Sequence, residues 1–236
     1  MSRRIGAPDR SLRLSRELLE AGGLEAILAG EAPGLRMLTD EERRESLRAV
    51  LEARPPGESW LFAYGSLIWN PTIHCIERRI ARIKGWHRAF CLSAIAGRGS
   101  PERPGLVLAL DEGGVCDGIA LRIVEGDIED ELALLWRREM VAAAYLPCWV
   151  DVLDREGRRF GSALAFTIDQ AGRHYAGDLD PDTLVHRLAT AAGSLGSSAD
   201  YLFRTRDELR AYGIPDPALE ELAAQVAAAV EKMTAG

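Results

Sequence analysis

The sequence lacks the features that mark several large classes of protein. Its 36 acidic side chains outnumber its 29 basic ones, giving a net charge of −7, so it has no basic surplus for binding nucleic acid. No apolar run approaches the roughly 20 residues that a membrane span needs. The first residues lack the apolar core of a signal peptide. We therefore expect a cytoplasmic protein that binds neither nucleic acid nor membranes.

Cysteine and histidine are scarce and scattered. Cys75, Cys91, Cys116 and Cys148 form no CxxC pair, and the four histidines have no metal-ligand spacing. These patterns favour neither a disulfide framework nor a metal site, and they suit a reducing compartment. His74 precedes Cys75, but adjacent residues on a strand point in opposite directions, which disfavours a nucleophilic Cys–His pair.

The sequence that is present divides into two segments. The 236 residues are 47% hydrophobic and 28% charged, as in ordinary globular domains. Residues 1–57 have helical patterns, including a capping box formed by Thr39 and Glu42, and "RPPGE" at 54–58 ends the helix. We predict a helical N-terminal extension over 1–57, beginning with a solvated basic arm over 1–16, and a main domain over 58–236.

Short apolar segments typical of strands follow from residue 59. Because few helices separate them, they indicate an antiparallel or mixed sheet that can close into a barrel, and they argue against a doubly wound parallel sheet. Two hairpins are predicted from turn residues between strands. The first joins 105–110 to 115–124 through "DEGG", and the second joins 148–153 to 161–168 through "DREGRR". Asp180-Pro181 and Asp216-Pro217 predict two helix starts near the C-terminus.

One helix interrupts the strand region and carries an unusual carboxylate. Its apolar stripe contains Ile128, Leu132 and Leu135, and the next position on that stripe is Glu139. The two arginines before Glu139 lie off the centre of the stripe, where charge is expected. Burial would raise the pKa of the carboxyl of Glu139, as a general base at neutral pH requires. The alternative is a structural glutamate paired with an arginine or with backbone donors.

The stretch "LFAYGSLIWNP" at 61–71 ends a buried strand in a small loop. Gly65 permits close approach to the backbone, Ser66 and Tyr64 offer hydroxyl groups, and released backbone N–H groups can converge on an anion. The alternative is a tight turn packed against Trp69.

Several segments, taken in order, resemble the ChaC-type γ-glutamylcyclotransferase family. They are YGSLIWNP (64–71), GWHRAFCL (85–92), RGSPERPGLVLALDEGGVCDGIALRI (98–123), RREM followed by Tyr145 and Pro147 (137–147), and DYL (200–202). The resemblance runs from about residue 60 to about residue 225. It implies an α+β fold, namely a small mixed β-barrel with surrounding helices.

The resemblance also implies a function. The family cleaves glutathione to pyroglutamate (5-oxoproline) and Cys-Gly by intramolecular aminolysis, a lyase reaction that needs no cofactor and no metal. Glu139 matches the catalytic glutamate, and the substrate-binding loop corresponds to Tyr64, Gly65, Ser66, Leu67, Ile68 and Trp69. Tyr145 or donors of this loop are candidates for stabilising an oxyanion, and Arg88 or Arg98 for pairing with the glycine carboxylate of glutathione.

Two departures from the family pattern leave alternatives open. "MVAAAY" follows Glu139 where relatives commonly have glycines, so a cyclotransferase for other γ-glutamyl amines or amino acids is an alternative. A γ-glutamyl-binding module without turnover is a second alternative. Residues 1–57 have no assigned counterpart in the family.

Overall fold

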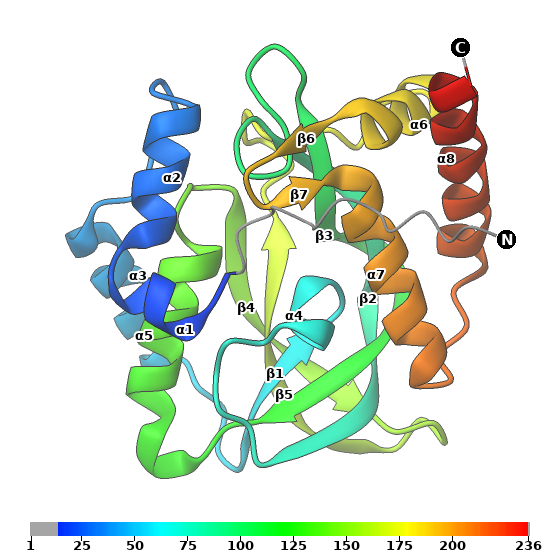
Figure 1. Cartoon of the computed structure of the whole chain (residues 1–236). Coiled ribbons are helices and arrows are strands. Elements are labelled where there is room, and N and C mark those ends of the chain that lie inside the picture. Colours follow the sequence, from blue (N-terminus) through cyan, green and yellow to red (C-terminus); the bar gives the residue numbers. More distant parts are fainter. Residues whose placement is uncertain (1–13, 236) are drawn as a thin grey trace, which may run out of the picture.

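A closed, five-stranded β-barrel forms the centre of the computed structural model, which describes residues 14–235 (Figure 1). The order around the barrel is β1-β3-β2-β4-β5, and β1 also pairs with β5. The β1–β5 and β3–β5 pairings are parallel, whereas the others are antiparallel, so the expectation of a mixed barrel is confirmed. The strands are β1 (Ser59–Ala63), β2 (Glu77–Ala94), β3 (Gly105–Arg122), β4 (Tyr145–Leu153) and β5 (Arg159–Ile168).

Helices surround the barrel, with α1, α2, α3 and α5 on one side and α6, α7 and α8 on the other (Figure 1). They are α1 (Arg16–Glu20), α2 (Gly23–Glu31), α3 (Asp40–Glu52), α4 (Ser66–Trp69), α5 (Ile128–Glu139), α6 (Pro181–Thr190), α7 (Ser198–Ala211) and α8 (Pro217–Ala235), with a 3-10 turn at Glu125–Asp127 and a small pair of strands, β6 (Ala192–Gly193) and β7 (Gly196–Ser197). Within the described part of the chain, no helix has both the length and the apolar character needed to cross a membrane.

Local signals in the sequence set most helix starts. The Thr39–Glu42 capping box is present at the start of α3. The side chain of Asp180 accepts a hydrogen bond from a backbone N–H in the first turn of α6, and Asp216 does the same at α8. These contacts satisfy N–H groups that have no partner within the helix. The predicted starts at Asp180-Pro181 and Asp216-Pro217 are therefore confirmed.

One predicted hairpin is wrong. The chain does not turn at 111–114, because β3 continues through this segment and pairs with β2 on both sides of it. Gly113 and Gly114 do have positive φ angles, 94° and 71°, and they lie opposite Gly85, whose φ is 84°. The glycines therefore form an irregularity that shifts the register of two long strands instead of a turn. The second predicted hairpin, β4–β5, is confirmed.

Helix α5 is fixed on the barrel by its apolar face. Leu132 and Leu135 are almost fully buried, and the ring of Trp136 meets that of Phe166 on β5 edge to face, with ring centres 5.5 Å apart. Burying each such side chain contributes roughly 1.5–3 kcal/mol. Because Glu139 is the last residue of α5, this packing also determines where its carboxylate lies.

The N-terminal helices are attached to α5 through a buried carboxylate. Glu131, whose side chain is 4% exposed, accepts hydrogen bonds of 2.9 and 3.0 Å from the guanidinium of Arg16 and one of 2.9 Å from the backbone N–H of His74. Burial raises the pKa of Glu131, but these bonds and the charge of Arg16 outweigh burial and lower that pKa below its ordinary value of 4.5. Residues 1–13 of the expected solvated arm lie outside the described residues. For its last residues the expectation is wrong, because Arg16 is held in this pair.

We predict that Glu131→Gln lowers the free energy of unfolding at neutral pH by about 1–3 kcal/mol, because the charge-assisted bonds are lost. The contribution is present while Glu131 is ionised, so the difference from the parent protein should shrink as the pH falls through the lowered pKa of Glu131. Chemical denaturation at several pH values measures this difference. Glu129→Gln, an exposed position on the same helix, is the matched control, and equal stability of the two variants would contradict the prediction.

Candidate active site

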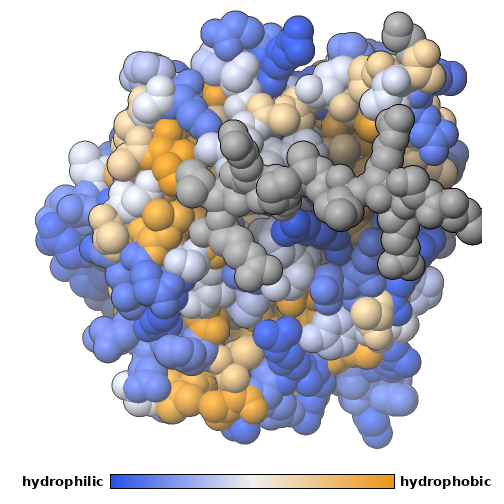
Figure 2. Space-filling view, viewed as in Figure 1, coloured by the Kyte–Doolittle hydropathy of each residue, from blue (hydrophilic) through white to orange (hydrophobic). Residues whose placement is uncertain are grey.

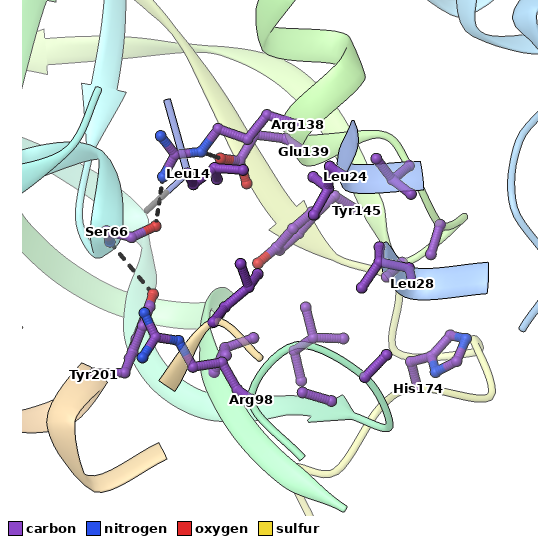
Figure 3. Close-up of a pocket in the computed structure, with 18 of the residues that line it drawn as sticks. Leu14, Leu24, Leu28, Ser66, Arg98, Arg138, Glu139, Tyr145, His174 and Tyr201 are labelled. Atoms are coloured by element: carbon purple, nitrogen blue, oxygen red, sulfur yellow. Dashed lines mark hydrogen bonds and ion pairs between the residues drawn. The ribbon is translucent and has the colours of Figure 1, made fainter. Parts of the chain in front are cut away.

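A cavity of about 770 Å³ lies where α4, the end of α5, the N-terminal segment and the β6–β7 turn meet (Figure 3). This volume is within the range of about 300–1,000 Å³ that is typical of small-molecule sites. The polar residues lining it are Ser15, Ser66, Trp69, Asn70, Ser93, Arg98, Arg138, Glu139, Tyr145, His174, Tyr201 and Arg204. Among the described residues, no group of three His, Cys, Asp or Glu side chains is placed to hold a metal ion.

Glu139 lies in the cavity wall with its side chain 13% exposed. Its Oε1 is 2.8 Å from Nε of Arg138. Burial raises the pKa of the Glu139 carboxyl above its ordinary value of 4.5, and the charge and hydrogen bond of Arg138 oppose this rise without cancelling it. Glu139 is thus both paired with an arginine and placed at a cavity, and such a carboxylate is suited to accepting a proton near neutral pH.

Arg138 connects this carboxylate to the loop that follows β1. Its side chain is only 4% exposed. Its guanidinium donates to Oγ of Ser66 at 2.9 Å, to Oγ1 of Thr72 at 3.3 Å and to the carbonyl of Asn70. Arg138 lies off the centre of the apolar stripe, as the sequence indicated, but it is buried because the loop covers the last turn of α5. Thr72 has a φ of 60°, which is rare for a β-branched residue, so the loop is held in a strained conformation beside Arg138.

The loop residues named from the sequence are placed in different environments. Ser66 and Trp69 line the cavity, whereas Leu67 and Ile68 are buried in the core. Tyr64 is also buried, and its hydroxyl donates to the carbonyl of Phe166 at 2.7 Å. Of the six loop residues named from the sequence, Ser66 and Trp69 are therefore the two that line the cavity.

Gly65 leaves room for a tyrosine hydroxyl. A Cβ on Gly65 would lie 2.7 Å from Oη of Tyr201, with the next nearest atoms, from Leu108, at 3.5 Å. That hydroxyl accepts a hydrogen bond of 3.3 Å from the backbone N–H of Ser66. A glycine is therefore needed here for space.

Two tyrosines, Tyr145 and Tyr201, line the cavity. The hydroxyl of Tyr145 donates to the carbonyl of Leu108 at 3.1 Å, and Tyr201 contacts the ring of Trp69 edge to face. Burial raises the pKa of both tyrosines, and the negative charge of Glu139 raises them further. Both therefore keep their protons at neutral pH and are available as hydrogen-bond donors.

The two arginines that the sequence offered as partners for the glycine carboxylate, Arg88 and Arg98, lie in different places. Arg98 lines the cavity, with its guanidinium 5.3 Å from the ring centre of Tyr201 and donating to the carbonyl of Ser197 at 3.1 Å. Arg88 does not line it. Its buried guanidinium pairs with Asp216 and donates to the carbonyl of Tyr64, so Arg88 as a ligand for a substrate carboxylate is wrong.

Sequence reasoning missed three contributors to the cavity. Arg138 was visible only as a neighbour of Glu139, and Tyr201 only as part of a short motif. Arg204, which lies over the ring of Trp69 at 5.7 Å, follows Tyr201 by one helical turn on α7. A signal for both α7 residues was present in their spacing, because residues three apart on a helix share a face.

Comparisons with known proteins show which family the chain belongs to. The family model described as ChaC-like protein matches residues 59–229. The glutathione-specific gamma-glutamylcyclotransferase of Escherichia coli is 43% identical over 187 residues, which is 79% of this chain and 80% of that protein. Glutathione-specific gamma-glutamylcyclotransferase 1 of Danio rerio is 30% identical over 176 residues, covering 72% of this chain and 90% of the relative.

Solved structures show the same fold. The crystal structure of a gamma-glutamyl cyclotransferase specific to glutathione from yeast superposes with a TM-score of 0.63 at 23% identity, over 72% of this chain and 96% of that one. A second crystal structure of the yeast protein gives a TM-score of 0.62 at 22% identity. With the family model matching most of the chain and the barrel shared with these structures, this protein belongs to the ChaC-like family.

Proposed function

We propose that this protein is a γ-glutamylcyclotransferase that cleaves glutathione to pyroglutamate and Cys-Gly. The observation that carries the proposal is the position of Glu139, a buried carboxylate with a raised pKa at the wall of a cavity, next to Arg138 and Ser66. The names of the E. coli and zebrafish relatives support glutathione as the substrate.

The Arg138–Glu139 pair complements the head of the substrate. A γ-glutamyl group carries an α-carboxylate and an α-ammonium on the same carbon. The guanidinium of Arg138 and the hydroxyl of Ser66 form a positive region for the carboxylate. Glu139 supplies the negative partner for the ammonium. In this orientation the two charges of the substrate match the two charges of the pair.

The reaction then proceeds within one substrate molecule. Glu139 takes a proton from the α-ammonium, and the freed amine attacks the γ-carbonyl carbon. A C–N bond forms and closes a five-membered ring, the bond from that carbon to the cysteine nitrogen breaks, and protons released by the attacking nitrogen pass to the leaving amine. No water is consumed. Because nucleophile and carbonyl are tethered, correct orientation supplies much of the rate.

The developing oxyanion needs a donor in the cavity. The hydroxyls of Tyr145 and Tyr201 both keep their protons because burial and the charge of Glu139 raise their pKa values. Either can turn toward the oxygen of the γ-carbonyl. A donor aimed at a developing charge commonly lowers the activation barrier by about 2.7–4 kcal/mol.

The second carboxylate of glutathione has a partner on the other side of Tyr201. Arg98 lines the cavity from the loop after β2, and Arg204 lines it from α7. A glycine carboxylate near Arg98 would extend the substrate across the cavity from Ser66. This placement favours a tripeptide over γ-glutamyl amines that have no second carboxylate.

Three further expectations belong to this proposal. The substrate is a small molecule, the protein works in the cytoplasm without a cofactor, and residues 1–57 form an extension to a cyclotransferase domain over 58–236. Four thiols without a disulfide in the described structure suit a reducing compartment.

Incubation with glutathione tests the proposal directly. Equimolar pyroglutamate and Cys-Gly, identified by mass spectrometry, are expected. γ-Glutamyl-alanine in a parallel reaction tests the alternative of a cyclotransferase for other γ-glutamyl compounds. Tight binding of glutathione without either product would instead support a γ-glutamyl-binding module.

We predict that Glu139→Gln lowers turnover of glutathione about 10²–10⁴-fold, because glutamine cannot accept the ammonium proton. Single-turnover assays on protein shown by its melting curve to be folded measure this loss. The matched control is Glu129→Gln on the exposed side of α5. Near-normal turnover in folded Glu139→Gln would show that another group is the base.

We also predict that Gly65→Ala raises the KM for glutathione about tenfold, equivalent to about 1.4 kcal/mol, because the new Cβ would displace the Tyr201 hydroxyl from Ser66. Adding Tyr201→Phe should relieve part of the loss, since the nearest atom remaining would then be at least 3.5 Å away. Gly30→Ala, where a Cβ meets nothing within 4 Å, is the control. Strictly additive effects of Gly65→Ala and Tyr201→Phe would argue against this steric explanation.

A further inference from the structure

One side of the cavity is apolar and comes largely from the N-terminal segment. Its leucines are called here the leucine wall: Leu24, Leu28 and Leu35, together with Leu195 from the β6–β7 turn. Figure 3 shows Leu24, Leu28 and His174 on one side of the cavity and Ser66, Arg138 and Tyr201 on the other, with Tyr145 between them. On the surface, apolar residues gather where α2 lies, bordered by hydrophilic ones (Figure 2).

The leucine wall is held firmly in place. The carboxylate of Glu31, at the end of α2, accepts hydrogen bonds from the backbone N–H of Gly97 at 2.6 Å and from that of Ser194 at 3.0 Å. These two residues belong to the loops that carry Arg98 and Leu195. Leu28 and Leu195 also approach each other around Gly97, where a Cβ would lie 3.7 and 3.0 Å from their side chains. The wall is therefore a built part of the cavity, fixed to the same loop as Arg98.

Glutathione alone would leave this wall largely uncovered. Both of its carboxylates and its ammonium find partners among Ser66, Arg98, Arg138 and Glu139. Its only side chain beyond the γ-glutamyl group is one methylene and a thiol. Each methylene of a ligand that is buried against an apolar surface stabilises the complex by about 0.8 kcal/mol. A ligand with an apolar group at this position would therefore bind more tightly.

We propose that the leucine wall binds an apolar substituent on the sulfur of the substrate, so that the enzyme also cleaves S-alkylated glutathione. This inference rests on the proposed function. The chemistry at the γ-carbonyl is unchanged: the α-amine bonds to the γ-carbon, the bond to the cysteine nitrogen breaks, and the leaving amine takes up the proton. The products are pyroglutamate and S-alkyl-Cys-Gly, and the thioether takes no part.

A series of substrates on the unmodified enzyme tests the inference. Values of kcat/KM are measured for glutathione and for S-methyl-, S-butyl- and S-hexylglutathione by pyroglutamate release. We expect kcat/KM to rise along the alkyl series, by about fourfold for each methylene that becomes buried. A flat or falling series, or no cleavage of S-hexylglutathione, overturns the inference.

Substituting a residue of the leucine wall tests whether the wall causes the preference for S-alkylated glutathione. Leu28→Gln keeps roughly the size of the side chain and removes its apolar character, so kcat/KM for S-hexylglutathione should fall about tenfold or more while that for glutathione stays within twofold. Ile27→Gln changes a neighbouring apolar residue of α2 that does not line the cavity, and it should leave both values unchanged. Equal losses for both substrates in Leu28→Gln would overturn the inference.

The outcomes separate this inference from the proposed function. Cleavage of glutathione without cleavage of S-hexylglutathione rejects only the role of the leucine wall. Absence of pyroglutamate from every substrate rejects the cyclotransferase function itself. If Leu28→Gln does not fold, the alkyl series on the unmodified enzyme decides alone.

Discussion

The guanidinium of Arg138 joins parts of the chain that are far apart in sequence. It donates to the side chain of Ser66 and the carbonyl of Asn70 after β1, and it pairs with the carboxylate of Glu139 at the end of α5. A buried charge is costly unless it is both paired and hydrogen-bonded, and Arg138 meets both conditions. Loop, helix end and carboxylate are thus fixed relative to one another by a single side chain.

The same arrangement explains why Glu139 differs from an ordinary surface glutamate. Burial opposes a negative charge at this position, so the pKa of Glu139 is raised although Arg138 lies beside it. Helix α5, which carries Glu139, is held in position because Leu132 and Leu135 are buried against the barrel. The stability of α5 on the barrel therefore maintains a carboxylate in an unfavourable environment, where it is more basic.

Much of this could be predicted from the sequence. The apolar stripe of α5 and the caps of α3, α6 and α8 are local patterns, and they predicted these helices and the position of Glu139 on an apolar stripe. Resemblance to the family gave the barrel. Gly113 and Gly114 led to a wrong hairpin prediction, because residues with positive φ occur both in turns and in strand irregularities. Only the position of these glycines opposite Gly85 shows that they form an irregularity. Arg138 and the leucine wall could not be foreseen, since both depend on contacts between segments far apart in sequence.

The dependence of kcat/KM for glutathione on pH tests the role of Glu139 most directly, because a general base must be ionised in the free enzyme. Because burial raises the pKa of Glu139 above its ordinary value of 4.5, the acid limb of this profile should lie above pH 4.5. Activity should fall as the pH decreases toward 4.5 and return when the pH is restored. The residual activity of Glu139→Gln should lack this limb. A profile that stays flat through pH 4.5, or an acid limb unchanged in Glu139→Gln, would contradict the account.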